Sequence, residues 1–582
     1  MLNRARITSS LVRSLLLGSC TAVVGTVMGA TVLVGCKDES QPEYWIDKLE
    51  DPAWKPRAIK RLEQFFEDSL TRANNDTSAP AVKALIDATV EPLTKAYATD
   101  YENLDEKTRE TLIKLLASFR DKRTEAGLKR AFDEFAKRGR GGRDVKWATR
   151  AVADLELASL SDTIFGAFDK LRADSEDGAI AYRDLADAMV RLKSKSWVGP
   201  LSSKLEADIT KIDPAKKDTI GDYKDQVYWQ ATAAKVLGEI GDTAAIEPLL
   251  KVLLDPAKAD VHTTALLALV KIGKPSMEPA VKLLSGQDTK LVEFSAMRFK
   301  RATGAPQLPK DKPHVQTAAV VLGMLGRSEA LQPLSAALNA AEEDGTKALL
   351  AREITKIVPA SAASKDVFKQ AYEKISGDTL TQQTNAIMML TEAAGTFFDP
   401  SMIGWLLERA EKVEASPDVK KGIQGVITLT AIKLMTPDQV GVVNGAVAKY
   451  GTQIEKDAFQ RASALLKTCG DKAACYLTEM EKTSNQDVKN QFTALKAGYM
   501  LAIFGNEQTR DDIVKHLSSF ENAAVRYIAS QAIDRLSPKG APAVADQLNE
   551  IIQKNAKSAD SDKIAGDEPL KQVMYRLRSR AN

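Results

Sequence analysis

Apolar residues recur at helical spacing along most of the chain, and the apolar stripes come in pairs. In Ala233–Leu253 the first stripe ends at Gly241, a residue type that readily takes the left-handed conformation of a helix C-terminal cap. The second stripe begins at Ile246 and has Pro248 in its first turn, where a missing N–H costs little. This pattern predicts two helices joined by a tight turn.

The helix pair recurs along the sequence. The stretch "VLGMLGRSEALQPLSAAL", which begins at Val321, matches the first unit without a gap at a distance of 85 positions, so that Gly326 and Pro333 correspond to Gly241 and Pro248. A helix pair cannot bury its apolar stripes alone, but a stack of such pairs forms one continuous core. The sequence therefore predicts an all-α fold, an α-solenoid of stacked antiparallel helix pairs.

These repeated residues resemble those of the HEAT-repeat family, and in particular its short phycobilisome-lyase-type variety. The resemblance is strongest over residues 228–338 and 462–548, and a weaker helical period extends over residues 44–580. The signature patterns of tetratricopeptide and ankyrin repeats do not occur. The resemblance implies a HEAT-like right-handed superhelix with a long face that binds other proteins.

Two segments interrupt the repeat. Glu206–Asp225 and Lys300–His314 lose the helical period, and the second contains three prolines and a glycine, so both are expected to be loops. Long loops on a solenoid often contact partners, although a tolerated insertion is the alternative. At the other end of the chain, "YRLRSR" from Tyr575 indicates a polar closing helix of the kind that a solenoid terminus requires.

The N-terminus has the pattern of an export signal. Three arginines precede Ser14–Gly35, which contains no charged residue, and Lys37 opens a polar stretch. A cleaved signal peptide and an uncleaved transmembrane helix both fit this pattern, and both would export the chain. Leu33-Val34-Gly35-Cys36 resembles the bacterial lipobox, which implies that residues 1–35 are a lipoprotein signal peptide, that Cys36 is lipidated and that residues 36–43 form a short tether.

Charge and the residue after Cys36 refine the expected location. Removal of residues 1–35, which hold three arginines and no acidic residue, leaves 78 Lys and Arg against 78 Asp and Glu. A balanced chain lacks the basic surface that nucleic-acid binding requires, so no nucleic-acid partner is expected. Lys37 stands where retention in the inner membrane of enteric bacteria would require Asp, which favours the outer membrane of a Gram-negative cell envelope.

Cys469 and Cys475 lie on either side of the turn in another copy of the repeat. When the two copies are aligned by their shared Gly-Asp, these cysteines fall on the apolar positions Ile240 and Ile246. Both side chains should then face the seam between the paired helices, within reach of a disulfide, which an exported chain would form. Two buried free thiols are the alternative.

The sequence offers little for catalysis. Some HEAT-like proteins are di-iron hydroxylases with repeated His-Glu pairs, but none of the three histidines, His262, His314 and His516, precedes a glutamate. No His-Glu-x-x-His, Gly-x-Ser-x-Gly or phosphate-binding loop motif occurs. The bilin lyases that give the repeat its name act in the cytoplasm, which does not suit an exported lipoprotein. No catalytic residue, cofactor or metal site is therefore predicted.

One basic stretch has two interpretations. Lys137–Lys146 holds five basic residues around three glycines and could meet anionic headgroups or lipopolysaccharide phosphates. Alternatively it is an inter-repeat loop whose charge is balanced by neighbouring carboxylates such as Glu134 and Asp144. The second interpretation is favoured, because charge runs on helical repeats are usually solvated faces.

Together these features predict an envelope-anchored HEAT-repeat lipoprotein that acts as a protein-binding scaffold and not as an enzyme. Its expected partners are other envelope proteins and, through the lipid on Cys36, the membrane. The alternative is an enzyme or enzyme-associated subunit, a relative of HEAT-like lyases or hydroxylases, with a carboxylate site that the sequence does not single out. The sequence names no small-molecule ligand.

Overall fold

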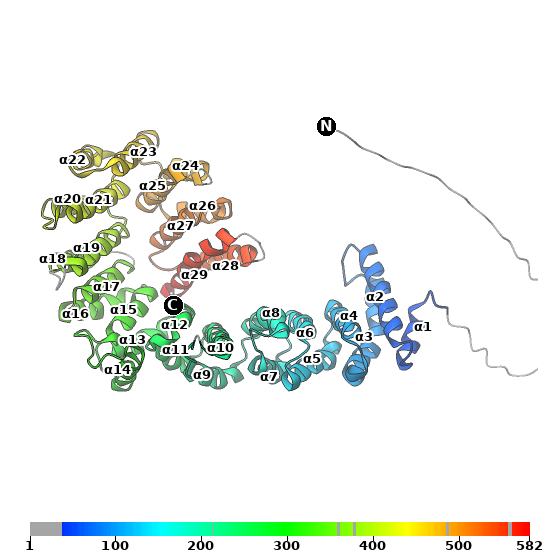
Figure 1. The fold of residues 1–582 in the computed structure, drawn as a ribbon. Coiled ribbons are helices and arrows are strands. Elements are labelled where there is room, and N and C mark those ends of the chain that lie inside the picture. Colours follow the sequence, from blue (N-terminus) through cyan, green and yellow to red (C-terminus); the bar gives the residue numbers. More distant parts are fainter. Residues whose placement is uncertain are drawn as a thin grey trace, which may run out of the picture.

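The computed structural model describes residues 38–213, 215–357, 361–375, 380–484, 488–556 and 561–581. Every regular element in these stretches is a helix, and consecutive helices stack in pairs (Figure 1). The all-α solenoid predicted from the repeats is therefore confirmed.

The first eleven α-helices form an extended row that we call the arm. They are α1 (Pro42–Asp47), α2 (Lys55–Arg72), α3 (Pro80–Asp100), α4 (Glu106–Phe119), α5 (Glu125–Arg138), α6 (Gly142–Leu155), α7 (Ser161–Lys170), α8 (Glu176–Leu192), α9 (Val198–Glu206), α10 (Asp218–Ile240) and α11 (Ile246–Leu253). The even-numbered helices α2 to α10 contact one another in order and form one side of the arm, and α3 to α11 form the other side (Figure 1).

The remaining helices form a closed body that we call the ring. They are α12 (Ala259–Ile272), α13 (Met277–Leu284), α14 (Thr289–Thr303), α15 (Pro313–Leu325), α16 (Leu331–Ala340), α17 (Asp344–Thr355), α18 (Ala362–Glu373), α19 (Leu380–Gly395), α20 (Met402–Glu411), α21 (Pro417–Leu434), α22 (Val440–Tyr450), α23 (Gln453–Cys469), α24 (Ala473–Ser484), α25 (Val488–Phe504), α26 (Glu507–His516), α27 (Ala523–Arg535), α28 (Pro542–Ala556) and α29 (Ser561–Ala581).

Short 3-10 helices occupy many of the turns. They are η1 (Lys48–Glu50), η2 (Tyr101–Asn103), η3 (Lys122–Thr124), η4 (Ala158–Leu160), η5 (Lys195–Trp197), η6 (Thr243–Ala245), η7 (Pro256–Lys258), η8 (Lys274–Ser276), η9 (Ser328–Ala330), η10 (Pro437–Gln439) and η11 (Leu517–Ser519).

The ring closes because its last helix returns to its first. The helices α12, α15, α17, α19, α21, α25, α27 and α29 contact one another in this order and form an inner row, and α29 then contacts α12 and α15. Figure 1 shows the C-terminal end beside α12, at the point where the arm joins the ring. The sequence predicted the stack of pairs but not its closure.

The glycine caps form where the repeat placed them. Gly241 ends α10 and Gly326 ends α15, and both adopt the left-handed helical conformation, with φ of +73° and +65°. Asp242 follows Gly241, and its side chain accepts a hydrogen bond from the Ala244 N–H. Pro248 lies in the first turn of α11. The local turn chemistry therefore sets the direction of each helix pair.

Both predicted loops are shorter than the sequence suggested. The segment Glu206–Asp225 was expected to be a loop throughout, but α10 already begins at Asp218. The segment Lys300–His314 is also helical at its ends, because α14 continues to Thr303 and α15 begins with Pro313. A proline in the first helical turn does not exclude a helix, since its missing N–H has no partner there in any case.

Two buried lysines tie neighbouring helix pairs together. The Nζ of Lys258 donates hydrogen bonds to the backbone carbonyls of Leu205 and Ala207, at the end of α9. The Nζ of Lys496 in α25 donates to the carbonyls of Lys433 and Met435, at the end of α21, with a distance of 3.0 Å to Lys433. Helix C-termini leave carbonyl groups without partners, so each lysine Nζ caps one helix from another unit.

Candidate functional site

The ring closure brings together backbone and side chains from opposite ends of the ring. Nε of Arg580 donates a hydrogen bond to the Gly326 carbonyl at 3.1 Å, and Arg327 donates to the Ser579 carbonyl. Arg576 also places Nη1 3.9 Å from the Met324 sulfur. Helix α29 therefore fastens the C-terminal end of α15 although more than 230 residues separate them in the sequence.

A buried carboxylate positions the two arginines of the closure. Asp534, near the end of α27, lies 2.8 Å from Nη1 of Arg580 and 3.1 Å from Nη2 of Arg576. All three side chains are less than 10% exposed. Burial alone would raise the pKa of Asp534, but the charges of Arg576 and Arg580 outweigh it and lower that pKa below its ordinary value. The cluster is thus a buried charged junction in which the carboxylate is paired with two guanidinium groups.

The sequence "YRLRSR" predicted a polar closing helix, and that prediction is wrong about the exposure of its arginines. The helix is present as the end of α29, but Arg576 and Arg580 are buried against α15 and α27 and do not face solvent. Both arginines lie three residues from buried Leu577 or Val573, on the apolar side of the helix. Their place on that stripe was the one sequence signal that could have indicated a buried role.

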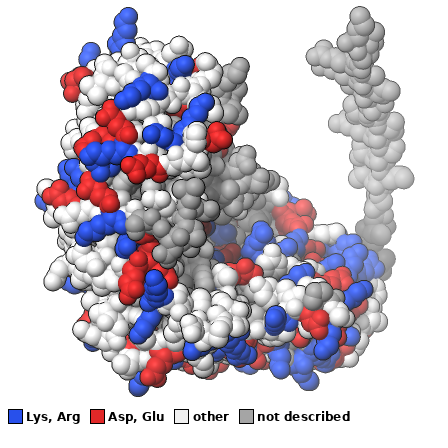
Figure 2. Space-filling model, turned by 60° about the vertical axis from the view of Figure 1, so that its left-hand side comes forward, with Lys and Arg blue, Asp and Glu red and all other residues white. Residues whose placement is uncertain are grey.

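Side chains from different helices of the inner row also pack against one another. The ring of Phe398, just after α19, lies 5.0 Å from that of Tyr499 in α25. Burial lowers the pKa of Lys356, the residue just after α17, and the nearby charge of Arg576 in α29 adds to the shift. Side chains from several parts of the inner row therefore meet within the ring, and its outer face carries intermixed charges of both signs (Figure 2).

The arm, in contrast, carries a row of charges on its even-numbered helices. We call this row the ladder, because successive helices are joined by ion pairs between exposed or half-buried side chains. Its pairs are Lys114–Glu63, Arg143–Glu110, Arg150–Asp184, Arg191–Asp154 and Lys235–Asp187. A further pair, Lys271–Glu239, continues the row to α12, the first helix of the ring. Exposed ion pairs contribute only about 0 to 1 kcal/mol each to stability. The ladder therefore defines the polarity of this face more than it holds the arm together.

Aromatic side chains lie beside the ladder. Tyr182 of α8 is 38% exposed, and its ring packs edge-on against Tyr228 of α10 at 5.9 Å. The Tyr228 hydroxyl donates to the Tyr182 carbonyl at 2.9 Å. Trp147 of α6 is half-buried under the guanidinium of Arg150, 5.1 Å from the ring centroid. Large aromatic and arginine side chains on a rigid face are the residue types that protein interfaces favour.

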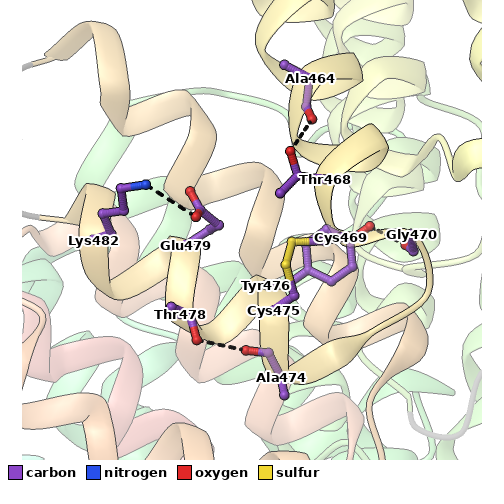
Figure 3. The surroundings of a disulfide bond; sticks show 10 residues. All are labelled: Ala464, Thr468, Cys469, Gly470, Ala474, Cys475, Tyr476, Thr478, Glu479 and Lys482. Atoms are coloured by element: carbon purple, nitrogen blue, oxygen red, sulfur yellow. Dashed lines mark hydrogen bonds and ion pairs between the residues drawn. A yellow bond between two sulfur atoms is a disulfide. The ribbon is translucent and has the colours of Figure 1, made fainter.

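The two predicted cysteines meet at the turn between α23 and α24. The structure joins Cys469 and Cys475 by a disulfide, with their Cα atoms 5.4 Å apart (Figure 3). Cys469 is buried, and the hydroxyl of Tyr476 donates to the Gly470 carbonyl beside the bond. The alignment of the repeats thus placed both sulfurs in one seam; the oxidation state of the pair in the cell stays a prediction.

The predicted anchor cannot be located in the same way. Cys36, together with the signal segment 1–35, lies outside the described residues, which begin at 38 within the expected tether. The first helix, α1, contains Tyr44, at which the array was expected to begin. Within the described part of the chain, no helix combines the length and the apolar character needed to span a membrane.

The three histidines lie in separate environments. Nε2 of His262 lies 3.0 Å from the Asp255 carbonyl, His314 is buried at the start of α15, and Nδ1 of His516 pairs with Glu481. Among the residues that the structure describes, no three His, Cys, Asp or Glu side chains gather closely enough to hold a metal ion.

The basic stretch Lys137–Lys146 covers the end of α5, the turn after it and the start of α6, and carboxylates pair with part of its charge. Arg138 pairs with Glu134 at 2.9 Å, and Arg143 pairs with Glu110 at 3.2 Å. Asp144 is buried, accepts a hydrogen bond from Tyr101, and has its pKa raised to about 6, chiefly by burial. These contacts support an inter-repeat turn over a free anion-binding surface.

A family model matches the unit from which the repeat was first recognised. Residues 229–255, which cover the second half of α10, the Gly241 turn and α11, match the PBS lyase HEAT-like repeat. The protein is an α-solenoid with HEAT-like repeats. The match covers one repeat, so the name of that family assigns no activity to the whole chain.

The solved structures that match this chain share little sequence with it. The karyopherin Kap121p bound to the extreme C-terminus of the protein phosphatase Cdc14p is 10% identical, with 89% of this chain and 68% of that chain covered and a TM-score of 0.38. Importin beta is 10% identical, covers 93% and 84%, and has a TM-score of 0.23.

A third similar structure, from a study of a phosphorylation switch in the interaction between cadherin and beta-catenin, is 12% identical, covers 92% and 99%, and has a TM-score of 0.26. None of these likenesses indicates a partner or an activity for this chain. Among curated proteins no match was found.

Proposed function

We propose that this solenoid is a lipoprotein of the Gram-negative cell envelope, anchored through an acylated Cys36, and that its arm binds other envelope proteins. The lipobox-like Leu33–Cys36 and the signal-like segment before it support the anchor, and Lys37 favours the outer membrane. Only five residues separate Cys36 from the start of α1 at Pro42, a span of at most about 22 Å. The arm would therefore begin close to the lipid surface.

The difference between the packed ring and the exposed surface of the arm supports the proposal. In the ring, α29 occupies the space beside α12 and α15, and side chains of the inner row pack against each other. On the arm, the ladder and Tyr182 remain at the surface of an extended row of helices. Long repeat arrays bind partners along such continuous faces. The even-numbered face of the arm is thus the best candidate for partner binding.

Site-specific photo-crosslinking in whole cells tests this assignment. A benzophenone amino acid replaces Tyr182 on the arm or, as a matched control, Ile454 on the ring, which is 70% exposed. We expect discrete crosslinked envelope proteins from position 182 and none, or far fewer, from position 454. Equal crosslinking from both positions would overturn the assignment to the arm. Absence of crosslinks from position 182 and from several positions of the ladder would overturn it as well.

Mass spectrometry of the mature N-terminus tests the anchor. A chain that begins with a diacylglyceryl-modified Cys36 is the expected result, and replacement of Cys36 by Ser should leave the protein unacylated. A mature protein that retains Met1 and residues 1–35 would contradict the lipoprotein assignment.

A further inference from the structure

The first two helices carry a surface of aromatic and basic side chains. Lys48 places Nζ 5.5 Å from the ring centroid of Tyr44 and 5.3 Å from that of Trp54. Arg57 lies over Trp54 at 5.3 Å and over Trp45 at 5.4 Å, and Trp45 itself is buried. Each cation therefore rests on a ring that fixes its position at the surface.

The patch extends along α2. Arg61 lies 5.6 Å from the ring centroid of Phe65, which is half-buried, and Lys60 next to it is exposed. Arg57 and Arg61 are one helical turn apart and therefore share one side of α2. Figure 2 shows Lys and Arg side chains gathered at the end of the arm where the described chain begins.

The basic side chains of this patch form no ion pair with a carboxylate among the described residues, whereas three nearby glutamates pair with lysines of α3 and α4. Glu50 pairs with Lys95 at 3.1 Å, and Glu63 and Glu67 pair with Lys114 at 3.5 and 3.7 Å. These glutamates are thus neutralised by lysines of α3 and α4. Over residues 42–72, Glu43, Asp51 and Asp68 are also exposed and form no ion pair within the described part of the chain. The four basic side chains of the patch outnumber these three carboxylates.

We propose that the α1–α2 patch, made of Tyr44, Lys48, Trp54, Arg57, Lys60 and Arg61, docks on the anionic phospholipid headgroups of the membrane that holds the anchor. Two observations select this occupant. The helix that opens the patch, α1, starts six positions after Cys36, at most about 22 Å along the chain, so an acyl group there would hold this end of the arm near the bilayer. Aromatic rings with exposed cations suit the interface, where the rings lie at headgroup depth and the cations meet phosphates.

The inference rests on the proposed lipid anchor for its setting, but its test does not require the lipid. A chain that begins at Lys37 keeps every described residue and carries no acyl group. Co-sedimentation with vesicles of phosphatidylethanolamine and phosphatidylglycerol, and with phosphatidylcholine vesicles, measures the contribution of the patch alone. We expect salt-sensitive binding to the anionic vesicles and at least about tenfold weaker binding to the neutral ones.

The double variant Arg57→Glu/Arg61→Glu should weaken binding to anionic vesicles at least about tenfold, because each basic group near such a surface contributes appreciably. The matched control is Lys290→Glu/Lys300→Glu on α14, which makes the same change in net charge at two exposed lysines of the ring. The control should bind as the parent does. An equal loss in both variants, or no loss in the first, would overturn the proposal.

A fluorescence measurement on the parent chain tests the patch in a way that does not depend on whether the charge variant folds. Brominated anionic lipids should quench part of the tryptophan emission, and Trp54→Phe should remove that part. Emission that is not quenched, or quenching that survives Trp54→Phe, would contradict the proposed orientation. An acylated mature protein whose patch fails these tests would contradict the docking proposal and leave the anchor intact. An unacylated mature chain whose patch binds the vesicles would contradict the anchor and leave the docking proposal intact.

Discussion

The backbone carbonyl of Gly326 accepts a hydrogen bond from Arg580, which lies 254 residues later in the sequence, at 3.1 Å. Through this contact the last helix of the solenoid completes a closed inner row with α12 and α15. An open repeat array leaves its last helix partly uncovered and must cap it with polar residues. Here the end of the array is covered by an earlier part of the same array.

Loss of Arg580 should open the ring. Arg580→Ala removes the bond to Gly326 and one of the two cations paired with buried Asp534, which should cost about 3 kcal/mol of stability. Small-angle X-ray scattering should then show a larger radius of gyration. Arg578→Ala is the control on the same helix, because Arg578 pairs with Asp546 at the surface. Equal radii for all three proteins would argue against the closure.

The two glycine caps give a second, steric test. Gly241 and Gly326 have the same left-handed conformation, so alanine at either position should cost about 1 kcal/mol from backbone strain. A Cβ at Gly241 would meet no atom within 4 Å, whereas at Gly326 it would lie 2.8 Å from Nη2 of Arg580. Gly326→Ala should therefore lower the midpoint of urea unfolding more than Gly241→Ala does. The reverse order would mean that α29 does not press on this turn.

The disulfide should make a modest contribution. Cys469 and Cys475 are six positions apart, so the closed loop is short, and its loss should reduce the free energy of unfolding by about 2 kcal/mol. Comparison of the parent with Cys469→Ser/Cys475→Ser in urea measures this difference. Mass spectrometry after alkylation without reduction should find no alkyl group on either cysteine in protein purified from cells. Full alkylation of both would contradict an oxidised pair.

His314 should make the protein sensitive to acid. Burial at the start of α15, with the charge of Lys312 nearby, lowers the pKa of His314 from 6.5 to about 4. The unfolded chain therefore binds the proton more readily, and stability falls as the pH drops from 6.5 towards 4. At pH 4.5 this linkage amounts to about 2 to 3 kcal/mol relative to pH 7.

His314→Leu should remove that part of the pH dependence. The measurement is the difference in the free energy of unfolding between variant and parent, at pH 7 and at pH 4.5. The free energy of unfolding of the variant, relative to that of the parent, should be higher at pH 4.5 than at pH 7. The contributions of other groups that titrate in both proteins cancel in this difference. A difference that is the same at both pH values would show that His314 is not held neutral by the fold.

Local features of this solenoid were predictable, and long-range ones were not. The turns at Gly241 and Gly326 depend on residues within one repeat, so their spacing predicted both caps correctly. The start of α10 at Asp218 was missed because its first turns are polar and lack an apolar stripe. Helical structure there depends on contacts that the sequence pattern does not record.

The candidate sites divide in the same way. Cys469 and Cys475 could be placed together because the alignment of two repeats put them on facing positions. Lys496 and Asp534 were missed, since a buried polar or charged group is stable only beside partners supplied by other helices. Closure of the ring depends on the summed curvature of many helix pairs, which no single repeat encodes.

A distance measurement across the junction of α15 and α29 tests the closed ring most directly. Spin labels at Ser328→Cys and Ala581→Cys, both exposed positions next to the closing contacts, are attached to the chain that begins at Lys37. Double electron–electron resonance should give a single narrow distribution at the short end of its range. A broad distribution centred at long distances would show an open solenoid and contradict the account.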